Sequence, residues 1–97
     1  MLSTKQRGYL AGMASTDAVV THLGKGGPTE AFIMQLSALL AQHELIKVKF
    51  VDFKDEKKTI SADLAVSTKS ELVRIIGNTA IFYKQNPDPE KRAIELI

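Results

Sequence analysis

Hydrophobic positions recur with helix or strand periodicity in seven segments of the 97-residue chain. The clearest segment is 29–43, where apolar side chains recur every three or four positions, as on one face of an amphipathic helix. Pro28 suits the first helical position, and Glu30 favours the positive end of the helix dipole. The predicted apolar stripe consists of Phe32, Ile33, Leu36, Leu39, Leu40 and His43.

Two further segments have helical character. Ser3 and Gln6 have the spacing of a capping box, which predicts a helix over residues 4–14. We expect this helix to bury Tyr9, Leu10, Met13 and Ala14, and to leave Lys5 and Arg7 in water. Asp55 is a candidate cap for a third helix that runs to about residue 69. That helix is expected to bury Ile60, Leu64 and Ala65.

Four segments have strand character. Residues 18–23 are rich in β-branched side chains, and residues 45–53 alternate between apolar positions and the lysines Lys47 and Lys49. Residues 72–76 and 79–84 are apolar runs separated only by Gly77 and Asn78. Both of these residues tolerate positive φ, so they predict a tight two-residue hairpin.

The order of elements is helix, strand, helix, strand, helix, strand, strand. Strands separated by helices favour parallel pairing, whereas the hairpin adds antiparallel pairing. We therefore predict an α/β domain with a four-stranded mixed sheet packed with helices. The domain is expected to span residues 1–84. Residues 85–97 are expected to form an extended C-terminal tail, because Pro87 and Pro89 cannot continue a helix or a central strand.

Composition indicates one globular domain rather than a disordered, fibrous or coiled-coil chain. The sequence has no cysteine, which excludes disulfides and thiolate chemistry. Its apolar runs are shorter than a membrane span, and its amino terminus has no secretory signal, so we expect a cytoplasmic protein. Thirteen Lys and Arg residues against eleven Asp and Glu residues give a net charge of +2. This imbalance is only a weak indication of a polyanionic partner.

The junction between the first predicted strand and the second helix is locally unusual. Three of the four residues Gly24, Lys25, Gly26 and Gly27 have no side chain, so another backbone can approach closely. The loop opens onto a helix whose first amides are unpaired and whose dipole favours an anion. Lys25 adds a positive charge, and Thr29 could contribute a hydroxyl group. Together these features are typical of a phosphate contact.

The loop does not match the common nucleotide-binding patterns. Its spacing lacks the Lys-Ser/Thr ending of a P-loop, and Thr29 stands where a dinucleotide-binding loop needs its last glycine. The remaining pattern is G-x-x-G, which KH domains use to hold a single-stranded nucleic-acid backbone. The alternative is a glycine-rich turn that serves geometry alone.

Four segments resemble the YhbY family of small bacterial RNA-binding proteins, whose domain is also called the CRM domain. These segments are residues 2–7, Val19-Val20 leading into Gly24–Gly27, residues 43–49, and residues 76–79 before Phe82-Tyr83. The resemblance implies a fold like the C-terminal domain of a bacterial translation initiation factor. It also implies association with precursors of the large ribosomal subunit, with the G-x-x-G motif and nearby basic residues contacting RNA.

We therefore expect a non-enzymatic, monomeric RNA-binding protein whose partner is ribosomal RNA or a large-subunit precursor. No metal, small-molecule cofactor or membrane is expected to take part. His22 and His43 have no metal-ligand spacing, and no nucleophile elbow is present. The alternatives are a protein-interaction module and a site for a small phosphorylated ligand. The candidate RNA-binding residues are Lys5, Arg7, Gly24, Lys25, Gly26, Gly27 and Thr29.

Overall fold

A four-stranded sheet forms the centre of the computed structural model, which describes residues 2–96. Its strands lie in the order β1-β2-β4-β3. Their bounds are Val19–Leu23 for β1, Leu45–Phe50 for β2, Glu71–Ile76 for β3 and Thr79–Tyr83 for β4. β1 pairs with β2 in parallel, whereas β4 runs antiparallel to both β2 and β3. The predicted mixed sheet and element order are confirmed.

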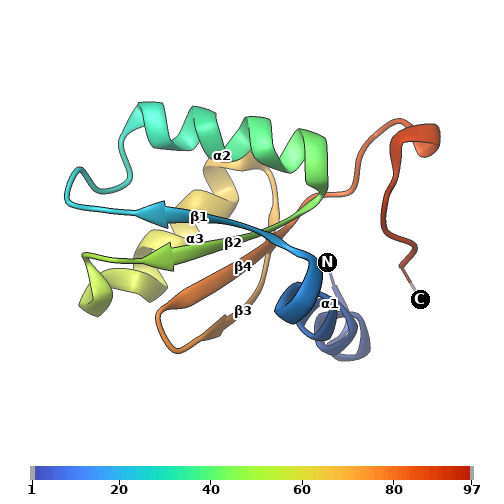
Figure 1. The fold of residues 1–97 in the computed structure, drawn as a ribbon, viewed down its shortest axis with the longest axis horizontal. Coiled ribbons are helices and arrows are strands. Elements are labelled where there is room, and N and C mark those ends of the chain that lie inside the picture. Colours follow the sequence, from blue (N-terminus) through green and yellow to red (C-terminus); the bar gives the residue numbers. More distant parts are fainter. Residues whose placement is uncertain (1, 97) are drawn as a thin grey trace.

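Helices cover both faces of the sheet, but to different extents (Figure 1). Their bounds are Thr4–Asp17 for α1, Glu30–His43 for α2 and Lys57–Thr68 for α3. α2 and α3 pack against one face, and their shared core includes Leu36, Phe50 and Phe82. α1 packs against the other face, where its core partners include Leu45 and Ile81. α1 covers only one end of that face, so part of the sheet stays open (Figure 1).

The predicted start of α1 is confirmed, but its predicted end is not. The Ser3 hydroxyl accepts from the Gln6 amide at 3.1 Å, and the Gln6 side chain accepts from the Ser3 amide at 2.9 Å. These two bonds form the capping box. The helix continues to Asp17 rather than ending near residue 14. Leu10 and Ala14 are fully buried, while Tyr9 and Met13 are partly buried.

Arg7 does not stay in water as expected. It is half-buried, and its guanidinium donates to the carbonyl of Leu72 and, at 3.0 Å, to the carbonyl of Val73. Both carbonyls lie on β3, where the register with β4 shifts between Leu72 and Arg74. The side chain therefore joins the first turns of α1 to an irregular edge strand. Sequence periodicity could not show this contact, because it spans more than 60 residues of chain.

The hairpin between β3 and β4 is confirmed, although only one of its two turn residues has positive φ. Gly77 has a φ of 60°, whereas Asn78 does not lie in that region. Glycine at the first central position is the arrangement of a type II′ turn. The Lys57 ammonium, at the start of α3, donates to the Gly77 carbonyl at 2.6 Å and so ties this helix to the hairpin.

Three further predicted boundaries are wrong. β2 ends at Phe50 instead of residue 53, because the Val51 amide turns to the Leu23 carbonyl at 3.0 Å. Asp55 caps no helix: it lies within a short 3₁₀ turn, Lys54–Glu56, that precedes α3. Pro28 lies one residue outside the helix cap rather than at the first helical position, since Thr29 is the N-cap of α2.

The tail after β4 folds back onto the domain and contains a short 3₁₀ turn, Pro89–Lys91. Glu44, which caps the end of α2, is only 1% exposed. One carboxylate oxygen accepts from the Asn86 amide at 2.6 Å, and the other accepts from the amides of Ala93 and Ile94 at 2.7 and 3.0 Å. Ile94 joins the core beneath α1. A single buried carboxylate therefore holds both ends of the tail segment.

Tyr83, the last residue of β4, lies beside this carboxylate. Burial raises the pKa of its phenol, and the charge of Glu44 raises that pKa further. Arg92 and the Gln85 amide lower the pKa in part. No hydrogen bond of ordinary geometry reaches the Tyr83 hydroxyl within the described chain, so the Gln85 contact is a loose one. The phenol thus keeps its proton to a higher pH than a free tyrosine does.

Candidate functional site

The glycine loop lies where β1 ends and α2 begins, at the edge of the molecule farthest from α1 (Figure 1). The Gly27 amide donates to the Gly24 carbonyl at 3.0 Å, which closes a tight turn. The Thr29 amide then donates to the Gly27 carbonyl at 2.9 Å. Lys25 and Gly26 form the exposed tip of the loop. β1 ends at Leu23, directly before the loop, so the predicted end of this strand is confirmed.

The two glycines at the end of the motif face opposite environments. Gly27 is buried, has a φ of 72°, and would place a Cβ atom only 3.1 Å from the Phe53 ring. Its lack of a side chain is therefore explained by packing and by backbone conformation. Gly26 is exposed, and the only atom near its Cβ position is a Thr29 methyl carbon at 4.0 Å. Nothing in the fold requires glycine at position 26, and the same is true of Gly24, whose Cβ position is open.

The start of α2 leaves two amides directed away from the helix ladder. The Thr29 hydroxyl accepts from the Phe32 amide at 3.1 Å, which is an ordinary N-cap bond. The amides of Glu30 and Ala31 have no backbone acceptor within the described residues. Both residues are exposed. Thr29 keeps its hydroxyl proton available for donation, so this turn can bind an anion through two amides and one hydroxyl.

A second loop, residues 51–56, lies against the glycine loop and carries Asp52, Asp55 and Glu56. It meets the glycine loop through its backbone and through the Phe53 ring, with the amides of Val51 and Asp52 both directed at Leu23. The Asp52 carboxylate accepts from the neighbouring Phe53 amide at 2.7 Å. The Asp52 carboxylate is thus bonded within its own loop, and Lys25 stays exposed at the tip of the neighbouring one.

The structure does not bring Lys5 and Arg7 to the glycine loop. Both lie on α1, at the end of the sheet where β1 begins, whereas the loop lies where β1 stops (Figure 1). Lys5 is exposed, and Arg7 is bound to the carbonyls of β3. The other five candidate residues, Gly24, Lys25, Gly26, Gly27 and Thr29, lie together in one turn.

The candidate RNA-binding residues predicted from the sequence do not include three basic residues that the structure places on one surface. Lys47, Lys49 and Arg74 lie on the sheet face that α1 only partly covers. The alternation of Lys47 and Lys49 along β2 was the signal for this surface. The position of Arg74 could not be inferred, because it depends on the irregular register of β3. The side chains of residues 2–96 form no cluster of three or more histidines and carboxylates that could hold a metal ion.

Comparison with known proteins gives a consistent result. Residues 2–84 match the family model described as the CRS1 / YhbY (CRM) domain. The chain is 34% identical over 97 residues to the Bacillus subtilis protein named probable RNA-binding protein YqeI, and the match covers 99% of each chain. It is 35% identical over 88 residues to a Haemophilus influenzae protein named RNA-binding protein, covering 90% of this chain and 89% of the relative.

A solved structure also agrees with the fold. The solution structure of Staphylococcus aureus SAV1595, which is described as a candidate RNA-binding protein, superposes with a TM-score of 0.81. The two chains are 36% identical and cover each other completely. Within residues 2–96, none of the helices has the length and apolar character that a bilayer span requires.

Proposed function

The chain belongs to the CRS1 / YhbY (CRM) domain family, and from this membership we propose that it is a non-enzymatic RNA-binding protein. Its proposed cytoplasmic partner is a precursor of the large ribosomal subunit, and the proposed contact is the glycine loop. The relatives named as RNA-binding proteins support the general activity. The observation that carries the specific proposal is the exposed Lys25-Gly26 tip directly before the unpaired amides of α2.

The loop can bind a sugar–phosphate backbone through three contacts. The open space at Gly24 and Gly26 lets a ribose–phosphate strand lie against the main chain. A phosphate can accept from the amides of Glu30 and Ala31 at the positive end of α2. Lys25 can then neutralise a neighbouring phosphate. All of these contacts are to the backbone of the nucleic acid, so they confer little base specificity.

Gly27 has a different part in this proposal. Its positive φ and its packing on Phe53 set the shape of the loop, and it is too buried to meet RNA through its own surface. This packing also favours the alternative, a protein-interaction module in which the glycine loop is only a turn. A substitution at Gly26 distinguishes the RNA contact from a purely structural turn, because the fold itself does not require glycine at this position.

Electrostatics sets the expected strength of binding. If about three to five cationic groups neutralise phosphates, the logarithm of affinity falls with the logarithm of salt concentration at a slope of roughly −2 to −4. With a net charge of only +2, tight binding to arbitrary RNA is not expected. Selection of a target then depends on RNA architecture or on neighbouring ribosomal proteins.

The test is co-sedimentation with large-subunit precursors after Lys25→Glu combined with Gly26→Asp. The proposal expects this variant to leave the precursor fractions while it keeps its fold by circular dichroism. The matched control is Lys91→Glu with Ala38→Asp, which makes the same charge change at exposed positions on the tail and α2. If the folded loop variant co-sediments as the wild type does, the glycine loop is not the RNA contact. A rise in melting temperature with nucleotides but not with RNA fragments would instead indicate a small phosphorylated ligand.

A further inference from the structure

On the sheet face beside α1, basic and apolar side chains lie together in two rows that cross the four strands. Strand register places four residues in one row across the sheet: Val20, Lys47, Ile81 and Arg74. Ile81 therefore has a basic residue opposite it on each neighbouring strand. The next row, toward the glycine loop, is His22, Lys49, Thr79 and Ile76. Cross-strand neighbours share one face of a sheet, so these eight side chains form one surface.

The charges on this surface have one sign. Lys47, Lys49 and Arg74 are cationic, His22 is the fourth basic group, and no acidic residue occupies either row. The acid on these strands that faces the same way is Glu71, opposite Tyr83, one row farther toward the buried end. Val20 and Ile76 are 44% and 55% exposed, respectively. Cations contact phosphates, and exposed apolar groups beside them can contact nucleobases, so the two kinds of group suit a single-stranded nucleic acid.

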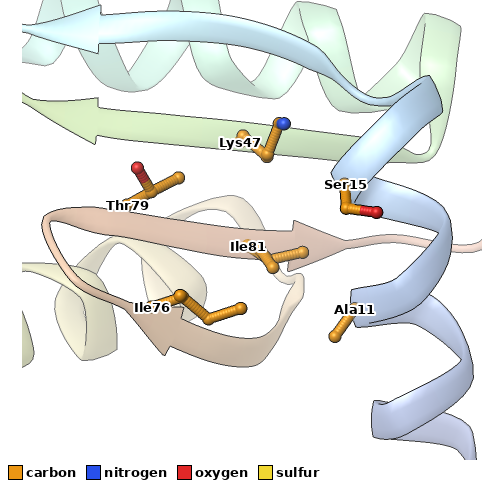
Figure 2. A pocket seen from close by; sticks show the side chains of 6 residues that line it. All are labelled: Ala11, Ser15, Lys47, Ile76, Thr79 and Ile81. Atoms are coloured by element: carbon orange, nitrogen blue, oxygen red, sulfur yellow. The ribbon is translucent and has the colours of Figure 1, made fainter.

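A hollow at the α1 end of this surface has the right character for a base (Figure 2). It lies between α1 and the β3–β4 hairpin and has a volume of about 270 Å³. Its walls are mainly aliphatic, from Ala11, Ile76 and Ile81, and Lys47 and Ser15 lie at its rim. The volume is just below the range of roughly 300–1,000 Å³ of drug-sized ligand sites, as suits one planar ring system.

This surface continues directly into the glycine loop. His22 is two residues before Gly24 on β1, and Lys49 lies opposite His22 on β2. A five-residue strand spans roughly 17 Å, so a chain leaving the loop crosses both rows within a few nucleotides. The glycine loop and the open sheet face are therefore together complementary to one extended polyanion.

We propose that the open sheet face is a second RNA site, which binds the single strand that leaves the glycine loop. Lys47, Lys49 and Arg74 neutralise its phosphates, and the hollow beside α1 holds one unstacked base. This inference rests on the proposed function and adds the one contact that could distinguish bases. It also assigns α1 a place in binding, through the hollow rather than through Lys5 and Arg7.

The charge contribution is tested with Lys47→Gln combined with Lys49→Gln. Binding is measured by fluorescence anisotropy with labelled single-stranded oligouridylates of about 4 and about 12 nucleotides, which bracket ordinary single-strand site sizes. Affinity for the longer probe should fall about 10- to 30-fold at 0.1 M salt, and the salt slope should become about 1.4 shallower. The matched control, Lys58→Gln on α3 with Lys69→Gln at its C-cap, changes two exposed lysines and should change neither quantity.

The hollow is tested with Ser15→Trp. Ser15 is exposed on α1 and lines the hollow, so an indole ring at this position would fill it. Affinity for the longer probe should fall about 5- to 100-fold, the order of magnitude for the loss of one bound base, with an unchanged salt slope. Ala38→Trp on the exposed side of α2 is the control. Ile76→Gln provides a second variant, which removes an exposed wall of the hollow without adding bulk.

The outcomes separate this inference from the proposed function. If the loop variant loses binding while the sheet and hollow variants bind the longer probe like the wild type, the second site is refuted and the glycine loop stands. If the sheet variants lose affinity for the longer probe only, the second site is supported. If neither the loop variant nor the sheet variant changes RNA affinity, both proposals are refuted.

Discussion

Glu44 offers the sharpest test of how this fold is held together. Its carboxylate is 1% exposed and accepts three amide hydrogen bonds from residues 42 to 50 positions away. Hydrogen bonds to a charged group contribute roughly 1.5–3 kcal/mol each. The three do not simply add, because the tail can detach and its amides can return to water. The loss is therefore limited by the free energy with which the tail docks.

Glu44→Gln keeps one acceptor oxygen but replaces the other with an amide group that donates. If the oxygen stays on Ala93 and Ile94, the new donor faces the donating amide of Asn86. We expect a loss of about 2–3 kcal/mol in the free energy of unfolding, or roughly 8–24 °C in melting temperature for a domain of this size. Glu44→Ala should cost about 1 kcal/mol more, as all three amides lose their acceptor.

The assay combines denaturant unfolding with amide hydrogen exchange read residue by residue. Exchange of Asn86, Ala93 and Ile94 should accelerate in Glu44→Gln, while the strands keep their protection. Glu95→Gln removes the same charge from an exposed position of the tail and should leave both measurements unchanged. If Glu44→Gln retains both the unfolding midpoint and the protection of these amides, the carboxylate does not hold the tail and the reasoning is wrong.

Three further predictions concern single side chains. Gly27→Ala should lower the free energy of unfolding by about 2–3 kcal/mol, because Gly27 has a positive φ and lies against the Phe53 ring. Gly26→Ala should change it by less than about 0.5 kcal/mol. Equal losses in the two variants would contradict the role of Gly27 in packing. Arg7→Met should cost about 1.5–3 kcal/mol through two lost bonds to carbonyls, with Lys5→Met as a nearly silent control in the same thermal melts. The raised pKa of Tyr83 means that the unfolded chain releases the phenol proton at lower pH than the folded protein does. Stability is therefore complete below about pH 10 and falls as the pH rises toward the folded value, and Tyr83→Phe should make that fall shallower in pH-dependent unfolding.

Local patterns were sufficient for most of the architecture. The three- and four-residue spacing of apolar side chains predicted α2, and the exposed turn after Leu23 and the hairpin at Gly77 followed from residues that tolerate unusual backbone geometry. These features depend on neighbours in sequence, so they are visible without the fold. Boundaries failed where a distant contact intervenes, as when the Val51 amide turns to Leu23 and ends β2 early.

Polar side chains with distant partners were the main omission. Arg7 was expected to stay in water and Glu44 was not singled out, yet each bonds to backbone groups more than 40 residues away. The row of Lys47, Ile81 and Arg74 was also invisible, because it exists only once β2, β4 and β3 are paired in register. For the glycine loop, the sequence could not show that Gly27 and Gly26 differ so much in surroundings.

The hydrogen bonds between Arg7 and β3 also bear on whether two copies of the protein can pair through the edges of their sheets. β3 is an outer strand, and an outer strand with free carbonyls invites another strand to pair with it. Here a guanidinium occupies two consecutive carbonyls, beside a register shift that distorts the strand. β3 is thereby a poor template for aggregation, which leaves the short strand β1 as the margin where intermolecular pairing could begin.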